Sequence, residues 1–281
     1  MCRLLKESKA DFVAADKFPN EKADYPIELA DLADWEACQR LLNGVDTLVH
    51  LANFSNFDSA PIETLYSVNV TMNMNLFQAA ANADCRRIIF ASSIQVLDGQ
   101  LPTMDRSKQE NVLSYIPVDS EAPPVPRNAY ALSKQAAENM LSYFADTEGM
   151  SCIAFRFPLL VDWEFMRKVR ESGGLKRGNA YDLFAYLPVY SAAEAVVKAT
   201  TAEIEGYHNY FIASKDNLEK TPACEIAAQE LSHLPCTRPI EEMDSLVDCS
   251  KVEVELGWSQ PQSLAESCEK YRGGESVRPY D

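Results

Sequence analysis

A tyrosine and a lysine stand four residues apart in the segment RNAYALSKQAAENML, residues 127–141, which has the pattern of a helix. Residues at positions i and i+4 lie on one face of a helix, so the side chains of Tyr130 and Lys134 can approach each other. A nearby ammonium group favours the phenolate and lowers the pKa of a phenol from its usual value of about 10, which makes tyrosine a usable general base. The same spacing also occurs by chance on solvated helix faces, so the pair needs support from its surroundings.

Two serines supply that support. Ser92 and Ser93 come at the carboxyl end of RRIIFASS, residues 86–93, which has the pattern of a buried strand. In open α/β sheets ligands bind beyond the carboxyl ends of the strands, so hydroxyl groups there point toward a binding crevice. The alternative is a turn capped by serine side chains, which is common.

Short apolar runs rich in β-branched residues alternate with helical patterns along the chain, which is typical of βαβ units around a parallel sheet. We expect strands at residues 10–16, 46–52, 86–93, 151–161 and 209–214. We expect helices at residues 34–42, 61–83, from 130 toward 144, 191–204 and 221–232. The fold class predicted from this alternation is α/β.

Composition excludes several classes of protein. The 281 residues are 47% hydrophobic and can bury a large core. The formal net charge of −16 argues against nucleic acid and against an anionic membrane surface as partners. The sequence has no apolar run of about 20 residues and no apolar segment near its start, so we expect a cytoplasmic location. The eight cysteines are scattered, so we expect reduced thiols and no metal site.

The motifs occur in the order seen in one family. The chain resembles the extended short-chain dehydrogenase/reductases, also called NAD-dependent epimerase/dehydratases. The matching pieces are ADFVAAD, ELADLAD, DTLVHLA, SVNVTMNMNLFQAA, FASSIQV, YALSK, FRFPLLV and DCSKVEVELGW. The resemblance implies a Rossmann-like doubly wound parallel sheet with a small C-terminal α/β lobe. Residues 1–160 would form the NAD-binding domain, and residues 161–281 a small substrate-binding lobe partly interleaved with it.

The resemblance also implies a catalytic set. Tyr130 would be the base and acid, Lys134 would activate it and hold the nicotinamide ribose, and Ser93 would hydrogen-bond the reacting oxygen. The reaction would be a hydride transfer, in which Tyr130 removes a proton from a sugar hydroxyl while the nicotinamide takes the hydride.

NAD is the cofactor that the resemblance implies. Asp16 would bind the adenosine ribose diol and repel a 2′-phosphate, which favours NAD over NADP. The other matched cofactor positions are Asp31 and Leu32 beside adenine, Leu51, Ala52, Asn53, Asn69 and Ser92 along the cofactor, Phe157 and Pro158 beside the nicotinamide, and Tyr130 and Lys134 themselves.

Simpler interpretations exist for several of these residues. Asp16 could be only a solvated strand end, and Asn69 could tie loops together. His50 lies between apolar neighbours, so we expect a packed strand residue rather than a catalyst. The patch RESGGLKRGN, residues 170–179, could bind a substrate phosphate or could be a solvated loop.

The chain departs from the family pattern at its start. The family opens with a strand and a glycine-rich turn that holds the cofactor pyrophosphate, and no such turn occurs here. Residues 3–16 align with the end of the first helix and the second strand, so roughly 20 residues of the usual βα unit would precede Met1. The missing strand would lie between residues 10–16 and 46–52. We therefore expect weak binding of NAD by this chain alone.

The sequence is compatible with more than one class of substrate. The stretch between Arg156 and Ser191 is short, which favours relatives that act on free sugars, such as uronate dehydrogenases, over those that bind sugar nucleotides. Leu97 stands where many members have tyrosine. The leading hypothesis is an NAD-dependent oxidoreductase or epimerase acting on a sugar or sugar nucleotide. The alternatives are a catalytically silent Rossmann-like binding or scaffold protein, and a reductase of a small carbonyl compound with the same catalytic residues.

Two of the expected helices could also form a dimer. Many relatives pair two helices from each subunit in a four-helix bundle, and the corresponding helices here begin near Pro61 and Tyr130. Their apolar residues suggest a homodimer, although the same residues could simply face the sheet. These residues are Leu76, Phe77, Leu141 and Phe144.

Overall fold

The computed structural model describes all residues except 57, 99–111, 163, 166–181, 218–220 and 264–281. The chain divides into two compact units of three stretches each. The first unit comprises Met1–Ser92, Ala129–Phe155 and Val196–Asn209, and the second comprises Ser93–Asn128, Arg156–Ala195 and Tyr210–Asp281. The expected roles of residues 1–160 in cofactor binding and 161–281 in substrate binding stay predictions.

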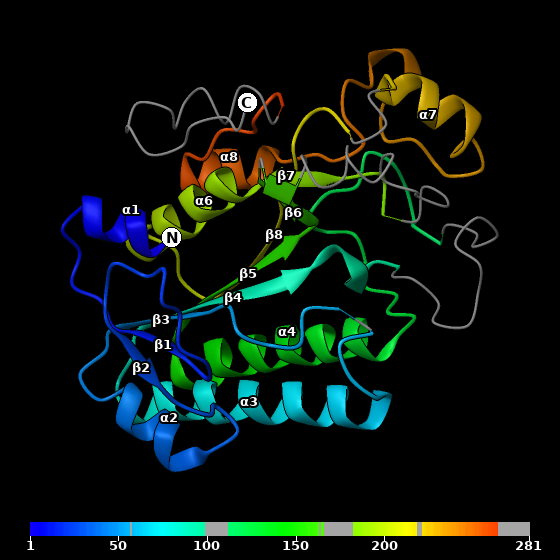
Figure 1. Cartoon of the computed structure of the whole chain (residues 1–281). Coiled ribbons are helices and arrows are strands. Elements are labelled where there is room, and N and C mark those ends of the chain that lie inside the picture. Colours follow the sequence, from blue (N-terminus) through cyan, green and yellow to red (C-terminus); the bar gives the residue numbers. More distant parts are fainter. Residues whose placement is uncertain (57, 99–111, 163, 166–181, 218–220, 264–281) are drawn as a thin grey trace. The chain divides into compact units, whose positions relative to one another are not determined.

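Two sheets begin in the first unit (Figure 1). In one sheet, β1 (Ala14–Asp16) pairs in parallel with β2 (Ile27–Leu29). The other sheet has the strand order β3 (Thr47–His50), β4 (Arg87–Ser93), β5 (Ser151–Phe157) and β8 (Tyr207–Phe211), and β3 and β4 are parallel. The predicted α/β class with parallel strands is confirmed. β1 and β3 belong to different sheets.

Three helices of the first unit accompany these strands. They are α2 (Trp35–Leu41), α3 (Ile62–Asn82) and α4 (Ala129–Glu148), and α3 packs against both of the others (Figure 1). Asp34 caps α2, because its Oδ1 accepts a hydrogen bond from the backbone N–H of Glu36 at 2.9 Å. Along α3 the buried positions recur at helical spacing, which gives the helix one inward face.

An aromatic core holds α3 and α4 on the sheet. The ring of Phe77 is fully buried and lies edge-on to Phe90 of β4 and Phe144 of α4, with ring centroids 5.8 and 6.2 Å apart. Leu76 and Leu141 are buried in the same cluster. The apolar residues that suggested a dimer therefore pack inside the chain, and the alternative that they face the sheet is confirmed. The exposed apolar residues of these helices are Ile62, Met74, Leu132 and Tyr143.

One predicted strand is wrong in its extent. The expected strand at residues 151–161 ends at Phe157, and Leu159–Val161 forms a separate strand, β6, that pairs with β7 (Tyr186–Pro188). Pro158 lies between them and has no N–H to donate, so it interrupts the ladder and lets the chain change sheets.

Other elements differ from expectation mainly at their ends. Of the strand expected at residues 10–16, only the last three residues are strand, and Pro61 is the residue before α3 rather than part of it. The expected helices at residues 191–204 and 221–232 are α6 (Val189–Thr201) and α7 (Ala223–Gln229). The patch at residues 170–179 lies outside the described residues.

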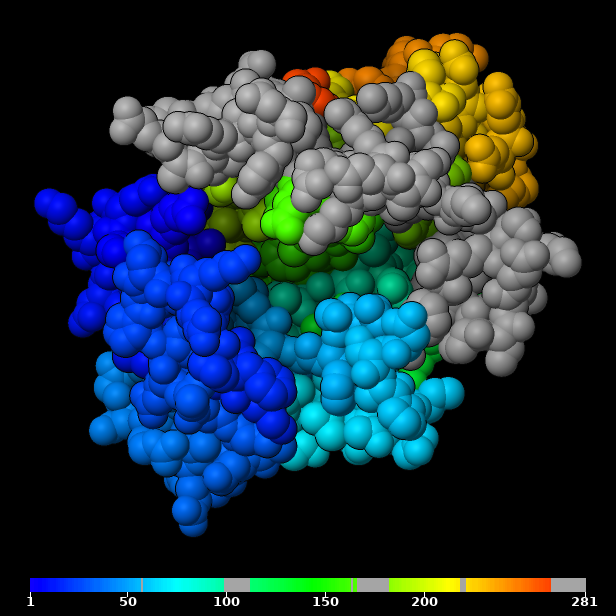
Figure 2. Space-filling model, in the orientation of Figure 1, coloured from blue at the N-terminus to red at the C-terminus, as the bar shows by residue number. Residues whose placement is uncertain are grey.

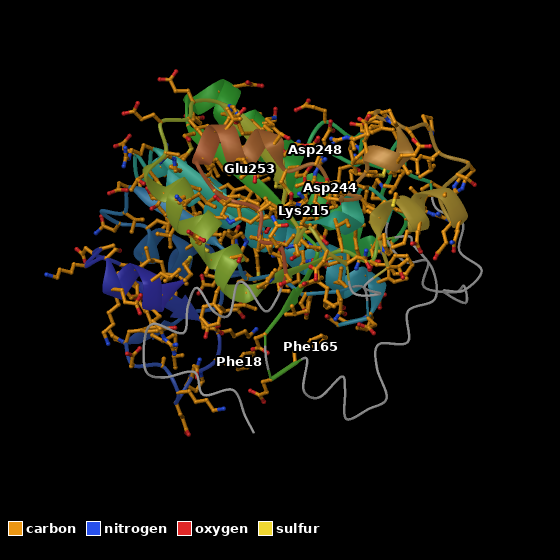
Figure 3. All side chains as sticks on the ribbon, turned by 90° about the horizontal axis from the view of Figure 1, so that it is seen from above. Phe18, Phe165, Lys215, Asp244, Asp248 and Glu253 are labelled. Carbon is orange, nitrogen blue, oxygen red and sulfur yellow. The ribbon has the colours of Figure 1, made fainter. Side chains whose placement is uncertain are left out.

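Polar contacts link segments of the second unit that are far apart in sequence. Its remaining elements are η1 (Ile94–Val96), η3 (Ile240–Glu242) and α8 (Ser250–Leu256), while α1 (Cys2–Glu7) belongs to the first unit. The buried Trp258 donates from Nε1 to the carbonyl of Ser191 at 3.0 Å. Lys215 and Asp244 form an ion pair at 2.5 Å, and Figure 3 shows the two side chains together.

Among the described residues, no helix combines the length and the apolar character that a membrane crossing needs. The expected cytoplasmic location stays a prediction.

Candidate active site

Helix α4 carries Tyr130, Lys134 and Glu138 on one buried face. The Nζ atom of Lys134 donates to the carbonyl of Ala91 at 2.7 Å and to Oδ1 of Asn53 at 3.1 Å. The same atom lies 5.6 Å from the centre of the Tyr130 ring. The proximity that the spacing of Tyr130 and Lys134 predicts is thus present in the structure.

Burial controls the charge of Lys134. Its side chain is enclosed, and removal from water lowers the pKa of the ammonium group to about 7, while the nearby carboxylate of Glu138 acts in the opposite direction. A lysine with such a pKa can gain and lose a proton close to neutral pH, which suits a group that takes part in proton transfer.

The two serines at the end of β4 have different partners. The hydroxyl of Ser92 donates to Oε1 of Glu138 at 2.6 Å, so Ser92 connects the strand end to α4. The hydroxyl oxygen of Ser93 accepts from the backbone N–H of Gln95 at 3.2 Å and caps η1. Capping is thus one role of Ser93, and a hydroxyl that accepts such a bond keeps its own hydrogen to donate.

A buried polar network connects β3, the loop after it and the two helices. Asn53 donates from Nδ2 to Oδ1 of Asn73 at 3.0 Å, and Nε2 of His50 lies 2.9 Å from the same oxygen. Asn69 accepts from the backbone N–H of Phe54 and donates to the hydroxyl of Ser133. The loop-tying interpretation accounts for these contacts of Asn69, and its place beside the cofactor stays a prediction.

His50 is a packed strand residue, as predicted. Its ring is buried beside Phe77 and Phe90, and burial lowers its pKa to about 3, so it is neutral at ordinary pH.

Sequence reasoning missed Asn73 and Glu138. Each lies four residues after a residue that it did select, Asn69 on α3 and Lys134 on α4, so the helical spacing could have identified both.

The carboxyl ends of β1 and β3 carry groups that suit an adenosine. Asp16 ends β1 in an exposed position, and its Oδ1 accepts from the backbone N–H of Phe18. Asp31 is paired with Lys17 at 2.7 Å, and this contact holds the pKa of Asp31 below its usual value. Leu51 directly follows β3 and is 47% exposed. In Figure 2 the blue surface of the first strands lies next to the light blue surface of the segment after β3.

The described residues therefore fit two parts of a dinucleotide and lack a third. Asp16 suits a ribose diol, and Lys134 suits the ribose beside the reacting ring. The first glycine of the chain is Gly44, so the residues before β1 contain no glycine-rich turn for a pyrophosphate. Phe157 ends β5 in a buried position and Pro158 follows it, which is where the sequence expected a wall beside the nicotinamide.

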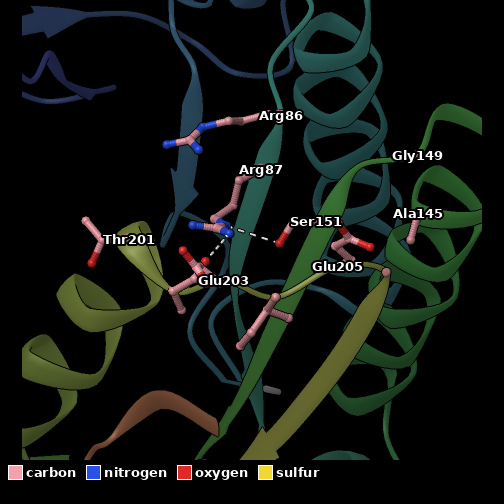
Figure 4. A pocket seen from close by; sticks show the side chains of 11 residues that line it. Arg86, Arg87, Ala145, Gly149, Ser151, Thr201, Glu203 and Glu205 are labelled. Carbon is pink, nitrogen blue, oxygen red and sulfur yellow. Dashed lines mark hydrogen bonds between the residues drawn. The ribbon is translucent and has the colours of Figure 1, made fainter.

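A cavity of about 1130 Å³ lies at the opposite ends of the strands (Figure 4). It is lined by Arg87 at the start of β4, Ser151 at the start of β5 and Glu203 after α6. The guanidinium of Arg87 donates to the hydroxyl of Ser151 and to the carbonyls of Thr200 and Ala202. Ligands of open α/β sheets bind at the carboxyl ends of strands, so this cavity is not the candidate active site.

Known proteins resemble the chain in sequence. It is 30% identical over 130 residues to a uronate dehydrogenase from Pseudomonas syringae pv. tomato, which covers 46% of this chain and 42% of that protein. It is also 30% identical over 145 residues to an L-arabinose 1-dehydrogenase (NAD(P)(+)) from Haloferax volcanii, which covers 50% of this chain and 55% of that protein. The chain spans about half the length of the curated relatives that it matches.

A solved structure shows the same fold. A short-chain dehydrogenase/reductase superfamily protein from Agrobacterium tumefaciens, with bound NAD, superposes with a TM-score of 0.67 at 17% identity, covering 96% of this chain and 90% of that protein. The model of the NAD dependent epimerase/dehydratase family matches residues 1–161, which is more than half of the chain. The protein is therefore a member of the NAD dependent epimerase/dehydratase family.

Proposed function

We propose that the protein is an NAD-dependent oxidoreductase or epimerase that acts by hydride transfer on a hydroxyl of a sugar or sugar nucleotide. The observation that carries this proposal is the buried ammonium of Lys134, 5.6 Å from the ring of Tyr130, in a chain of this family. The dehydrogenases of uronate and L-arabinose among its relatives favour a free sugar as the substrate.

Each catalytic residue has a separate task in the proposed reaction. Tyr130 takes the proton of the substrate hydroxyl, and the positive charge of Lys134 stabilises the phenolate that does so. Ser93 donates a hydrogen bond to the reacting oxygen. NAD would supply the acceptor for the hydride of the substrate carbon. With the proton passing to Tyr130, the O–H and C–H bonds would break and a carbonyl would form. In an epimerase the hydride would return to the other face of that carbonyl.

The cofactor would be held mainly at its two ends. Asp16 would accept hydrogen bonds from the adenosine ribose diol, and Asp31 and Leu32 would lie beside the adenine. Leu51, Ala52 and Asn53 would line the cofactor. Lys134 would donate to the ribose of the nicotinamide. We propose Ser92, Asn69, Phe157 and Pro158 as further positions along the cofactor.

A catalytically silent Rossmann-like binding or scaffold protein is the competing proposal. The two proposals differ in what they require of Tyr130, because only the enzyme needs its hydroxyl.

We also propose a homodimer, supported by exposed apolar residues on α3 and α4 such as Met74 and Leu132. Light scattering at micromolar concentration should give twice the mass of one chain. A monomeric mass would rule out the dimer.

Tyr130→Phe should lower the turnover of a uronate or of L-arabinose by about 10²- to 10⁴-fold, because general base catalysis is lost. The formation of NADH measures this turnover. Tyr143→Phe is the matched control, since Tyr143 lies on the same helix and is 55% exposed. Equal turnover in Tyr130→Phe and wild type would remove Tyr130 from the mechanism. Wild type without turnover on any sugar tested would favour the scaffold.

NAD should bind this chain with a dissociation constant weaker than micromolar, because no glycine-rich turn holds the pyrophosphate. Calorimetric titration with NAD and with NADP measures this, and NADP should bind more weakly still. Asp16→Asn should bring the dissociation constants of NAD and NADP closer together, because it removes the charge that repels a 2′-phosphate. Micromolar binding of NAD would contradict this expectation.

The free energy of unfolding should depend on Lys134 between about pH 7 and pH 10. The pKa of Lys134 is about 7 in the folded protein and about 10.4 in an unfolded chain, so the folded state binds fewer protons in this window. The contribution of Lys134 to stability therefore rises with pH through the window, and below it the full cost of burying the charge remains.

Lys134→Met removes this contribution, so wild type should gain stability relative to the variant as the pH rises from 7 to 10. Urea unfolding of both proteins at several pH values measures the trend, and Lys22→Met, at an exposed position, controls for the lost charge. A difference that stays constant with pH would mean that Lys134 is not titrating in this range.

A further inference from the structure

Four side chains, three of them buried and Asn53 half-buried, form one hydrogen-bonded chain from β3 to α4. Lys134 donates to Oδ1 of Asn53 at 3.1 Å, and Asn53 donates from Nδ2 to Oδ1 of Asn73 at 3.0 Å. Nε2 of His50 lies 2.9 Å from that same oxygen of Asn73. His50, Asn73 and Lys134 are each more than nine-tenths buried.

The ammonium group fixes the direction of every bond in this chain. An ammonium has only N–H donors, so Asn53 must turn its oxygen toward Lys134. The amide nitrogen of Asn53 then faces Asn73, which must in turn present its own oxygen. Because that oxygen also meets Nε2 of His50, the neutral ring of His50 must carry its hydrogen on Nε2. Any reversed amide would place two donors against each other.

Packing alone does not explain an asparagine at position 73. Its Nδ2 is buried and has no hydrogen-bond partner among the described residues. A buried amide nitrogen without a partner destabilises a fold, and a leucine of similar size would avoid this cost. What the asparagine supplies is an oxygen that accepts two hydrogen bonds, one from Asn53 and one from His50.

We propose that Asn73 and His50 are positioning residues that hold the amide of Asn53 with its oxygen on the ammonium of Lys134. The hydrogen-bond chain stands on the structure alone, and its catalytic consequence rests on the proposed function. A bond from Asn53 to Asn73 also polarises the amide, which makes the oxygen of Asn53 a better acceptor for the ammonium. Loss of the oxygen at position 73 lets Asn53 turn away and leaves Lys134 with one of its two hydrogen bonds.

The groups around Lys134 determine whether its side chain is charged or neutral. On α4 it faces Tyr130 and Glu138, on β4 the carbonyl of Ala91 and the ring of Phe90, and His50 lies beyond Asn53 and Asn73. Glu138 is the carboxylate that favours the charged lysine. Weakening the bond from Asn53 favours the neutral lysine, so Tyr130 would lose part of the charge that stabilises its phenolate.

The first test needs no activity. The chain has three histidines, so NMR of their ring nitrogens can follow His50. In wild type His50 should be neutral with its hydrogen on Nε2 from about pH 5 to pH 8, in a hydrogen-bonded state that Asn73→Leu abolishes. Leu76→Ala is the control, because it opens the core beside α3 but keeps the chain of bonds. A wild-type His50 with its hydrogen on Nδ1, or a doubly protonated ring, would overturn the proposal.

The second test separates positioning from stability. Asn73→Leu should lower kcat by about 10- to 100-fold and move the rise of kcat to higher pH, with little change in KM for the sugar. Asn73→Asp keeps an acceptor and should restore most of kcat, without the shift to higher pH. Leu76→Ala should leave the pH profile unchanged.

The outcomes of the two tests can be told apart. The same profile in Asn73→Leu and Asn73→Asp, or the same shift in Leu76→Ala, would overturn the positioning role. A wild-type protein that shows the expected state of His50 but turns over no sugar would refute the proposed function and still support the hydrogen-bond chain.

Discussion

The buried ammonium of Lys134 places the strongest constraint on the first unit. A charge removed from water is stable only where hydrogen bonds and counter-charges replace the lost hydration. Here the carbonyl of Ala91, the amide of Asn53 and the carboxylate of Glu138 do so, and they come from β4, from the loop after β3 and from α4. Because these partners must converge on one atom, the ends of two strands and one helix are fixed relative to each other.

Helix α3 serves both the apolar core and this polar centre. Phe77 packs on Phe90 and Phe144, while Asn73, one turn earlier on the same face, accepts from Asn53 and His50. A helix places residues four apart side by side, so the aromatic contacts that fix the position of α3 also fix the oxygen of Asn73. The apolar packing therefore determines how accurately the polar groups meet.

Much of this arrangement could be predicted from local patterns. Asp34 before an amphipathic run predicts the start of α2, and the spacing of Tyr130 and Lys134 predicts their proximity, because capping and helical periodicity act over a few residues. The break at Pro158 was missed, since the apolar run on both sides of it resembles one strand. Helical spacing places Asn73 and Glu138 on the same faces as Asn69 and Lys134, but their hydrogen-bond partners, Asn53 and Ser92, belong to other elements, which only the tertiary structure identifies. The same limit applies to Leu76 and Leu141, whose pattern fits a core and an interface equally well.

Affinity for the cofactor and transfer of the proton would depend on different parts of the chain. The network around Lys134 is built from β3, β4, α3 and α4, whereas a pyrophosphate is held in this fold by backbone amides of a glycine-rich turn. The net charge of −16 has little direct influence on a bound dinucleotide, because charges farther than about 8 Å are screened at physiological ionic strength. The nearby carboxylates matter more. Asp31 is already paired with Lys17, and Asp16 is exposed. Under the proposed function, Asp16 would therefore be the charge that repels a phosphate on the adenosine ribose. Under the proposed function, selection against that phosphate would depend on one carboxylate, whereas affinity for the pyrophosphate would depend on backbone amides.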